Sequence, residues 1–485
     1  MRESIVHTSL GALEGTHEHG AFVWKGIPYA EPPTENLRFK SPVPVKAWEG
    51  VRKEQSFGPV CPQYVNDSMV AQDPKVLDQS EDCLYLTIWT PEAPSEKPLP
   101  VVVWIHGGAF VGGHSSNPLY HGNALAKRGN VIVVSFNYRL GALGFLNLSH
   151  LDAAYTPNAG LLDQVEALNW VQSHIASFGG DPANVTIMGE SAGSMSVAAL
   201  LAMPAAKGLF SKAIMQSGAS QAMPLQLSKQ VTSYFLTQIG ADTPDSLANV
   251  SVSDLVAAQG KVADITGPLL TFQPVIDGNV LPLEPQQAIA DGAAKDIPLL
   301  LGTNQDEGAF FIREDNLLEE QEIVRILATE MPEPQAEVVA KKYSSSHASQ
   351  AQFITDLYFW RTSLQFIEAQ SHFAPVWMYR FDGYIQGHPL FGEPVHAAEI
   401  PFVFGQLGVF QQLGFPITEE AMALSSRMQD AWLAFIQQGS PSTAALNWGG
   451  YTTETRATMV FAEPTTHHVF DPDAEKRAAL MRGWV

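Results

Sequence analysis

Short apolar runs alternate with longer mixed segments along most of this chain. Stretches between the runs, such as residues 161–178, have helical composition. Strands that are apolar on both sides and separated by helices predict a largely parallel sheet with helices on both faces, so the expected fold class is α/β. Six apolar runs have the length and residue types of buried strands: residues 98–105, 131–136, 185–188, 213–216, 298–301 and 376–380.

Two regions depart from this alternation. Residues 11–14 and 22–32 are punctuated by Gly and Pro and predict short strands in a small antiparallel extension. Residues 315–358 are acidic and alanine-rich and predict a helical lid or side region. Because no Gly/Ser-rich or Pro-rich linker separates these parts, residues 1–485 are expected to form one elaborated domain.

Composition narrows the class of protein. A hydrophobic content of 45% is ample for a buried core, and a formal net charge of −22 argues against nucleic-acid or anionic-membrane partners, which need clustered Lys and Arg. Residues 1–8 lack the succession of basic, apolar and small residues that marks a signal peptide. No apolar run reaches the roughly 18 residues of a membrane span. We therefore expect a cytoplasmic location.

The sequence contains two cysteines, Cys61 and Cys83. Two cysteines exclude a disulfide-dense scaffold and a four-cysteine zinc site. One disulfide is possible, but in a reducing cytosol free thiols are the expectation.

Ser191 is the first candidate catalytic residue. It lies between a short apolar strand, residues 184–188, and a helix-forming stretch, residues 194–203. The local sequence is Gly189-Glu190-Ser191-Ala192-Gly193. This is the pattern of a nucleophile elbow, in which a tight turn with positive φ exposes the serine and glycines let the backbone approach closely.

A serine that attacks a carbonyl needs donors for the negative charge that develops on the oxygen. His106, Gly107, Gly108 and Ala109 directly follow the predicted strand 98–105, and such small residues let backbone N–H groups point into a cleft. The N–H of Ala192 adds a further donor. An ordinary Gly-rich turn is the alternative, but the elbow downstream favours an oxyanion hole.

Blocks over nearly the whole chain resemble the type-B carboxylesterases, which include bacterial para-nitrobenzyl esterases and the cholinesterases and have the α/β-hydrolase fold. The resemblance implies a serine carboxylesterase that forms an acyl-enzyme on Ser191, acts on a small-molecule ester, uses no cofactor or metal, and is a monomer or small homo-oligomer. The blocks are residues 22–30, 80–86, 106–110, 136–141, 158–164, 178–182, 189–193 and 216–218.

The resemblance also implies the partners of Ser191. His396 matches the catalytic-histidine block of the family, and Glu307 matches its acidic block. The chain order Ser191, Glu307, His396 is that of α/β-hydrolases. His106 is a rival, but it precedes the serine and belongs to the oxyanion loop. Asp306 competes with Glu307, although successive side chains point differently and only one can reach the histidine.

Supporting residues follow from the same resemblance. Gly107, Glu190 and Ser217 are expected close to the triad. Two structural ion pairs are implied, Arg38 with Glu81 and Arg139 with Asp163.

Substrate preference is predicted from one loop. In the cholinesterases, a tryptophan that attracts quaternary ammonium groups lies between the two matching cysteines. Here that loop contains Tyr64 and acidic residues such as Asp67 and Asp73, but no tryptophan, so neutral small or aryl esters are expected to be preferred. A lipase or an amidase on the same triad, or a non-catalytic cholinesterase-like binding module, are the alternatives. The last is disfavoured because every candidate triad position is filled.

Overall fold

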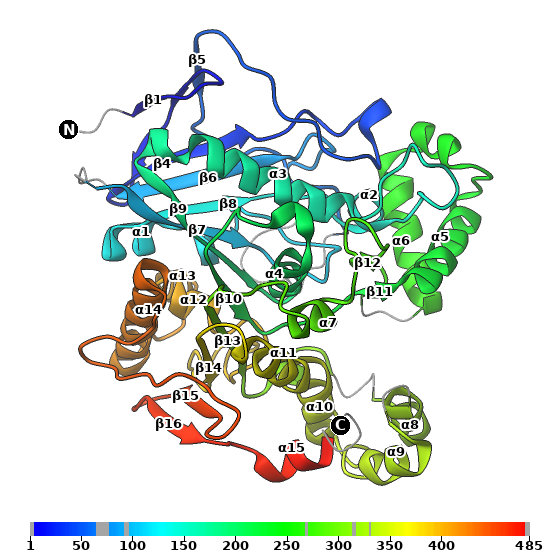
Figure 1. Ribbon diagram of the computed structural model, residues 1–485, viewed down its shortest axis with the longest axis vertical. Helices are drawn as coiled ribbons and strands as arrows, with labels where there is room; N and C mark the ends of the chain where they lie inside the picture. The colour runs from blue at the N-terminus through cyan, green and yellow to red at the C-terminus, as the bar shows by residue number, and fades with distance from the viewer. Residues whose placement is uncertain are drawn as a thin grey trace.

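The computed structural model describes residues 4–64, 77–91, 97–266, 270–312, 317–328 and 331–480. Within them, eleven strands form one sheet (Figure 1). Their spatial order is β16 (His467–Phe470), β15 (Ala457–Phe461), β14 (Val376–Phe381), β13 (Leu299–Asn304), β10 (Lys212–Gln216), β9 (Gly180–Glu190), β7 (Leu99–Ile105), β8 (Ile132–Phe136), β6 (Tyr85–Pro91), β4 (Ala21–Pro28) and β3 (Thr16–Glu18).

The middle of this sheet is parallel. Strands from β8 through β7, β9, β10, β13 and β14 to β15 pair in parallel, whereas β6, β4 and β3 at one end and β16 at the other pair antiparallel. All six predicted strands are present, which confirms the largely parallel α/β architecture. The sequence pattern did not predict β6 and β15, because β6 interrupts its apolar residues with threonines and β15 is a short run.

Helices cover both faces of the sheet, as predicted. In β7, Val101 and Val103 belong to one buried cluster and Val102 and Trp104 to the other, since successive side chains of a strand point to opposite faces. Each such fully buried side chain contributes about 1.5–3 kcal/mol by leaving water. The first cluster contains buried residues of α3 (Ala159–His174), α4 (Ala192–Ala202) and α11 (Arg361–Ser371). The second contains buried residues of α1 (Asn123–Gly129), α12 (Ile400–Val403) and α14 (Glu419–Gln438).

The N-terminal extension is smaller than predicted and is not purely antiparallel. Strand β2 (Ala12–Glu14) pairs antiparallel with β1 (Ile5–His7) but parallel with β5 (Val51–Lys53). The run 22–32 instead contributes β4 to the main sheet, because its apolar side chains are buried on both faces.

Most of the described part of the acidic region is helical. It forms α8 (Glu320–Ala328), α9 (Glu333–Ala340), α10 (His347–Ile354) and the start of η8 (Thr355–Trp360), a stretch of π-helix. Residues 315, 316, 329 and 330 of the predicted region lie outside the described residues. In Figure 1, α8 and α9 lie at the periphery, and α10 leads from them toward the sheet.

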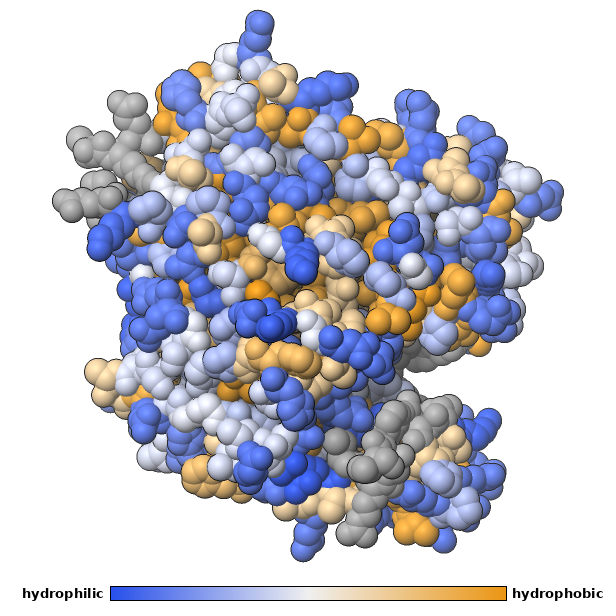
Figure 2. Space-filling model, viewed as in Figure 1, coloured by the Kyte–Doolittle hydropathy of each residue, from blue (hydrophilic) through white to orange (hydrophobic). Residues whose placement is uncertain are grey.

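The visible surface is mostly hydrophilic. Figure 2 shows hydrophobic residues gathered in the middle of this face, over and beside α4 and α7 (Pro285–Ala290), with hydrophilic residues around them. None of the helices in the described ranges combines the length and the apolarity that crossing a bilayer requires.

Both ion pairs implied by the resemblance are formed. The guanidinium of Arg38 lies 2.6 Å from Glu81, and that of Arg139 lies 2.7 Å from Asp163 in a fully buried position. Such pairs fix geometry more than they add stability, because burial costs each charge its hydration.

Cys61 and Cys83 are free thiols, as expected, and both are buried. The neighbouring Cys61 thiol and burial together raise the pKa of Cys83 well above its usual range.

Candidate active site

Ser191 lies in the turn between β9 and α4. Its backbone has φ 56° and ψ −125°, a strained conformation for a residue with a side chain. The predicted positive φ is therefore confirmed. The turn requires a glycine at position 193, because a Cβ there would lie 2.0 Å from the carbonyl oxygen of Ile105. This geometry projects the serine hydroxyl from the carboxyl end of the strand.

The structure brings His396 and Glu307 to this serine. His396 Nε2 lies 2.8 Å from Ser191 Oγ, and His396 Nδ1 lies 2.6 Å from Glu307 Oε2. The three residues follow the carboxyl ends of β9, β13 and β14, which meet at one edge because the strands are parallel. The bonds suit an imidazole that donates from Nδ1 to the carboxylate and accepts the serine proton at Nε2.

The two rival residues, His106 and Asp306, have other contacts than the hydrogen-bonded chain of Ser191, His396 and Glu307. His106 stacks on Tyr138 with ring centroids 4.5 Å apart, and its Nδ1 lies 2.8 Å from the Gly107 oxygen. Burial lowers the pKa of His106 to about 3, so this ring is neutral and structural. Asp306 bonds to Pro394 through its backbone N–H, and the structure brings its neighbour Glu307 to the histidine instead.

The predicted oxyanion loop lies beside the serine. A Cβ on Gly107 would lie 2.9 Å from the Ser191 Cβ, so the loop can come this close only with glycine there. Gly108 and Ala109 both have positive φ, which turns successive N–H groups toward one side. Within the described part of the chain, no group accepts a hydrogen bond from the amides of Gly108, Ala109 or Ala192. These amides are available to a substrate oxygen.

Buried carboxylates surround His396. Burial by itself lowers the pKa of His396, but the carboxylates of Glu190 and Glu307 outweigh it and raise this pKa to about 9. Glu190 Oε1 lies 3.2 Å from His396 Nε2. Burial raises the pKa of Glu190 to about 8, helped by the negative charges of Glu399 and Glu307. Glu190 and His396 therefore titrate as a linked pair, because the charge of each changes the pKa of the other.

Metal-binding side chains are not grouped here. Within the described ranges, no three His, Cys, Asp or Glu side chains are placed to share a metal ion.

Comparison with known proteins shows where this chain belongs. The family model described as "Carboxylesterase family" matches residues 2–478. The chain is 48% identical over 488 residues to the para-nitrobenzyl esterase of Bacillus subtilis (strain 168), with 99% of each chain covered. This chain belongs to the carboxylesterase family.

Further relatives agree with this membership. The carboxylesterase is 35% identical to the fumonisin B1 esterase of Sphingopyxis macrogoltabida, over 90% of this chain and 82% of the relative. A solved structure titled as a thermophilic PNB esterase matches it with a TM-score of 0.94 and 46% identity, covering 99% of this chain and 100% of that one. The fold is the α/β-hydrolase fold, and the protein is a carboxylic ester hydrolase, as the resemblance implied.

Sequence reasoning missed three polar residues of the carboxylesterase site. Asn304 donates its backbone N–H to Glu307 Oε1 over 2.7 Å and its side-chain amide to Glu399 over 2.7 Å. Gln216 donates to the other oxygen of Glu399 over 3.0 Å. Gln216 lies in the block 216–218, Asn304 in the acidic block, residues 303–311, and Glu399 in the catalytic-histidine block, residues 394–405, so the blocks themselves were the available signal. Ser217, which was predicted, is buried and donates its backbone N–H to Gly302.

Aromatic rings enclose the imidazole of the carboxylesterase. The ring centroids of Phe310, Phe311 and Phe359 lie 5.7, 5.1 and 4.8 Å from that of His396. Phe310 and Phe311 come three and four residues after Glu307, whereas Phe359 comes from the π-helix η8. These rings displace water, which strengthens electrostatic interactions within the site.

Proposed function

We propose that this carboxylesterase hydrolyses neutral carboxylic esters through an acyl-enzyme on Ser191. The observation that carries the proposal is the unbroken hydrogen-bonded chain from Ser191 through His396 to Glu307, with distances of 2.8 and 2.6 Å, next to three uncommitted amides. Nucleophile, base and orienting acid occur together in this geometry in serine hydrolases on several folds.

The reaction proceeds in two halves. His396 Nε2 takes the Ser191 proton as Oγ attacks the ester carbonyl, and Glu307 stabilises the imidazolium that forms. The amides of Gly108, Ala109 and Ala192 bind the oxyanion, and His396 then protonates the departing alcohol. In the second half, water attacks the acyl carbonyl and gives a proton to His396. His396 passes this proton to Ser191 Oγ as the bond between the acyl carbon and Oγ breaks and the acid is released.

Supporting roles fall to residues around this core. Gly107 keeps the oxyanion loop close to the serine, and Ser217 and Gly302 are joined behind the elbow by a backbone hydrogen bond of 2.9 Å. Glu190 sets the charge next to His396. A small-molecule ester is the only partner this mechanism needs. The cytoplasmic location and the monomer or small homo-oligomer expected from the sequence stay predictions.

A hydrolysis series tests the proposal. We expect para-nitrophenyl esters to be cleaved, a fluorophosphonate to label Ser191, and chelator to leave the rate unchanged. Emulsified triglycerides and aryl amides serve as probes of the lipase and amidase alternatives. Loss of activity with chelator that zinc restores, or labelling at another serine, would contradict the mechanism.

The pH dependence gives a prediction on Glu190. Activity requires neutral His396, so the rate should rise from acidic pH to a plateau. The carboxylate of Glu190 stabilises the imidazolium and raises the pKa of His396. Glu190→Gln removes this charge, so the acidic limb of kcat/KM against pH should move to lower pH. A limb that keeps its position in Glu190→Gln would show that Glu190 is uncharged throughout the transition.

Substrate charge gives another prediction. Recognition of quaternary ammonium uses the face of an aromatic ring, preferably tryptophan, and the loop between Cys61 and Cys83 has none. Its Asp67 and Asp73 lie outside the described residues. Neutral esters should show higher kcat/KM than acylcholines with the same acyl group, measured side by side. Preference for the choline esters would show that other aromatic side chains, such as Phe310, bind the cation.

A further inference from the structure

A continuous helical segment connects the candidate active site to the C-terminal helix. It runs through α10, the π-helix η8 and α11, that is from His347 to Ser371. Stretches of π-helix carry an extra residue per turn, are rare, and are frequent at functional sites. Here the π-helix lies between the rings around His396 on one side and buried charges on the other.

Two contacts join η8 to the site. Phe359 places its ring centroid 4.8 Å from that of His396. Thr355 Oγ1 accepts a hydrogen bond of 2.9 Å from the N–H of Gly308, the residue after Glu307. A movement of η8 therefore displaces both the wall next to the histidine and the turn that holds the acid.

The opposite contacts of η8 converge on Asp356. This carboxylate is 2% exposed, and it accepts hydrogen bonds from Tyr343 over 2.8 Å and from Gln352 over 2.6 Å. Its positive partner is Lys476 of α15 (Ala474–Leu480), whose Nζ lies 2.9 Å from Asp356 Oδ1. The same ammonium lies 4.6 Å from the centre of the Trp360 ring, at a cation–π distance.

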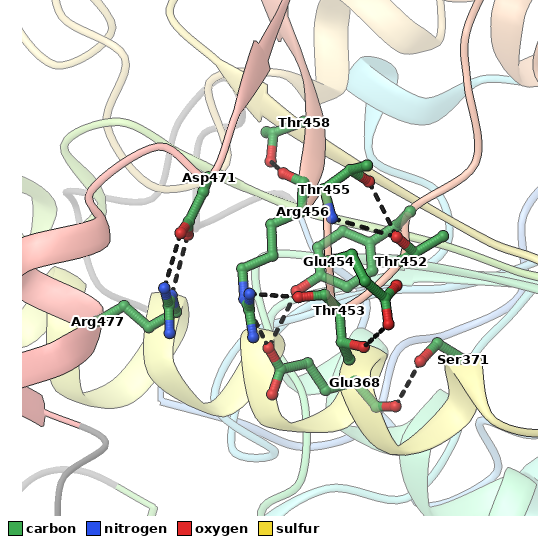
Figure 3. A network of polar contacts seen from close by, with 11 residues as sticks. Glu368, Ser371, Thr452, Thr453, Glu454, Thr455, Arg456, Thr458, Asp471 and Arg477 are labelled. Carbon is green, nitrogen blue, oxygen red and sulfur yellow. Dashed lines mark hydrogen bonds and ion pairs between the residues drawn. The ribbon is translucent and has the colours of Figure 1, made fainter.

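Helix α15 is itself fixed to the body of the molecule. Arg477 of α15 forms a two-pronged pair with Asp471, at 2.9 and 2.7 Å, and Asp471 donates its backbone N–H to Thr455 over 3.1 Å. The next residue, Arg456, pairs with Glu368 of α11 at 3.0 Å (Figure 3). Leu480 is buried in the main apolar cluster. Lys476 is thus presented to Asp356 from a docked helix, so the pair can transmit the position of α15 to η8.

We propose that Lys476 is a positioning residue that sets the shape of the ester-binding pocket by holding Asp356, and through it the π-helix that carries Phe359. This rests on the proposed function of the Ser191 site. Without Lys476, the buried carboxylate keeps the hydrogen bonds from Tyr343 and Gln352 but loses the ammonium that lies 2.9 Å from it, and solvating it requires η8 to shift. Phe359 then moves away from His396, and the pocket accepts larger acyl groups.

The decisive variant is Lys476→Met, which keeps an unbranched side chain at this position and removes the charge next to Asp356 and Trp360. We measure kcat and KM for para-nitrophenyl esters of increasing acyl length. We expect the ratio of kcat/KM for long over short acyl groups to rise about fivefold or more, with most of the change in KM. Lys476→Arg keeps the charge and should restore the wild-type ratio, and Lys476→Met with Asp356→Asn should move it back toward wild type by removing the unpaired carboxylate.

Lys25 provides a matched control. Its Nζ lies 2.7 Å from Glu18 and 5.0 Å from the centre of the Phe57 ring, in β4 toward the other end of the sheet. Lys25→Met therefore removes the same kinds of contact and should leave the acyl-length ratio unchanged. An unchanged ratio in Lys476→Met, or an equal change in Lys25→Met, overturns the proposal.

Two further arms keep the test decisive. If Lys476→Met does not fold, Tyr343→Phe takes its place, because it removes a neutral donor from Asp356. The ratio of kcat/KM for long over short acyl groups must then rise, by less than expected for Lys476→Met. An unchanged ratio in Tyr343→Phe overturns the inference. If the wild-type protein cleaves no ester, the proposed function fails, whereas normal wild-type hydrolysis with an unchanged ratio in the variants defeats this inference alone.

Discussion

Ser191→Ala should lower kcat for ester hydrolysis by roughly 10⁴- to 10⁶-fold. The substitution deletes the oxygen that would form the acyl-enzyme and leaves His396 without the hydroxyl that lies 2.8 Å from its Nε2. The amides of Gly108, Ala109 and Ala192 and the binding pocket remain, so a small residual rate above that of water is expected. The measurement is kcat on a para-nitrophenyl ester with protein freed of host esterases.

The same variant should fold like the wild type. Ser191→Ala removes one oxygen, and its backbone strain is unchanged because alanine has to adopt the same positive φ. Thermal unfolding and circular dichroism provide the control. Activity within tenfold of wild type in a folded, purified variant would mean that another residue is the nucleophile. Ser194→Ala would not serve as a neutral control, because the Ser194 hydroxyl is buried and bonded to the Gly218 oxygen.

Much of the fold could be predicted because its central strands are buried on both faces. A strand such as β7, with residues of both apolar clusters, needs apolar residues at nearly every position, and this leaves a run that can be recognised in sequence. Strand β4 is also buried on both faces, but its Gly and Pro led to the prediction of short strands in an N-terminal extension outside the main sheet. Pairing partners that lie far apart in the chain, such as β2 and β5, leave no local pattern.

The residues of the site also differ in how far the sequence could predict them. Ser191 and the loop with Gly108 and Ala109 are short local motifs whose turns require small residues, so their sequence predicts their conformation. His396 and Glu307 meet across 89 residues of chain, and only the family resemblance pointed to them. The contact of Asp356 with Lys476 has no sequence signal, because it joins a π-helix to a helix near the C-terminus.

Glu307→Gln should lower kcat by about 10⁴-fold, far more than Asp306→Asn does. Glu307 is fully buried, accepts the Asn304 N–H at one oxygen and lies 2.6 Å from His396 Nδ1 at the other. A glutamine fits this space but carries no charge. Its amide can also donate to Nδ1 and so favour the tautomer that places the imidazole proton on Nε2, where it cannot accept the serine proton.

Asp306→Asn is the matched control, because it makes the same chemical change one residue earlier. Asp306 is half-buried, and its pKa is raised by burial and by the neighbouring carboxylate of Glu393. It lies outside the hydrogen-bonded chain of the triad, so neutralising it should change kcat by less than about tenfold. Both variants are compared on one ester across the pH range, since a misplaced base would also distort the acidic limb. Equal losses in the two variants, or a larger loss in Asp306→Asn, would show that Asp306 is the acid that His396 needs during catalysis.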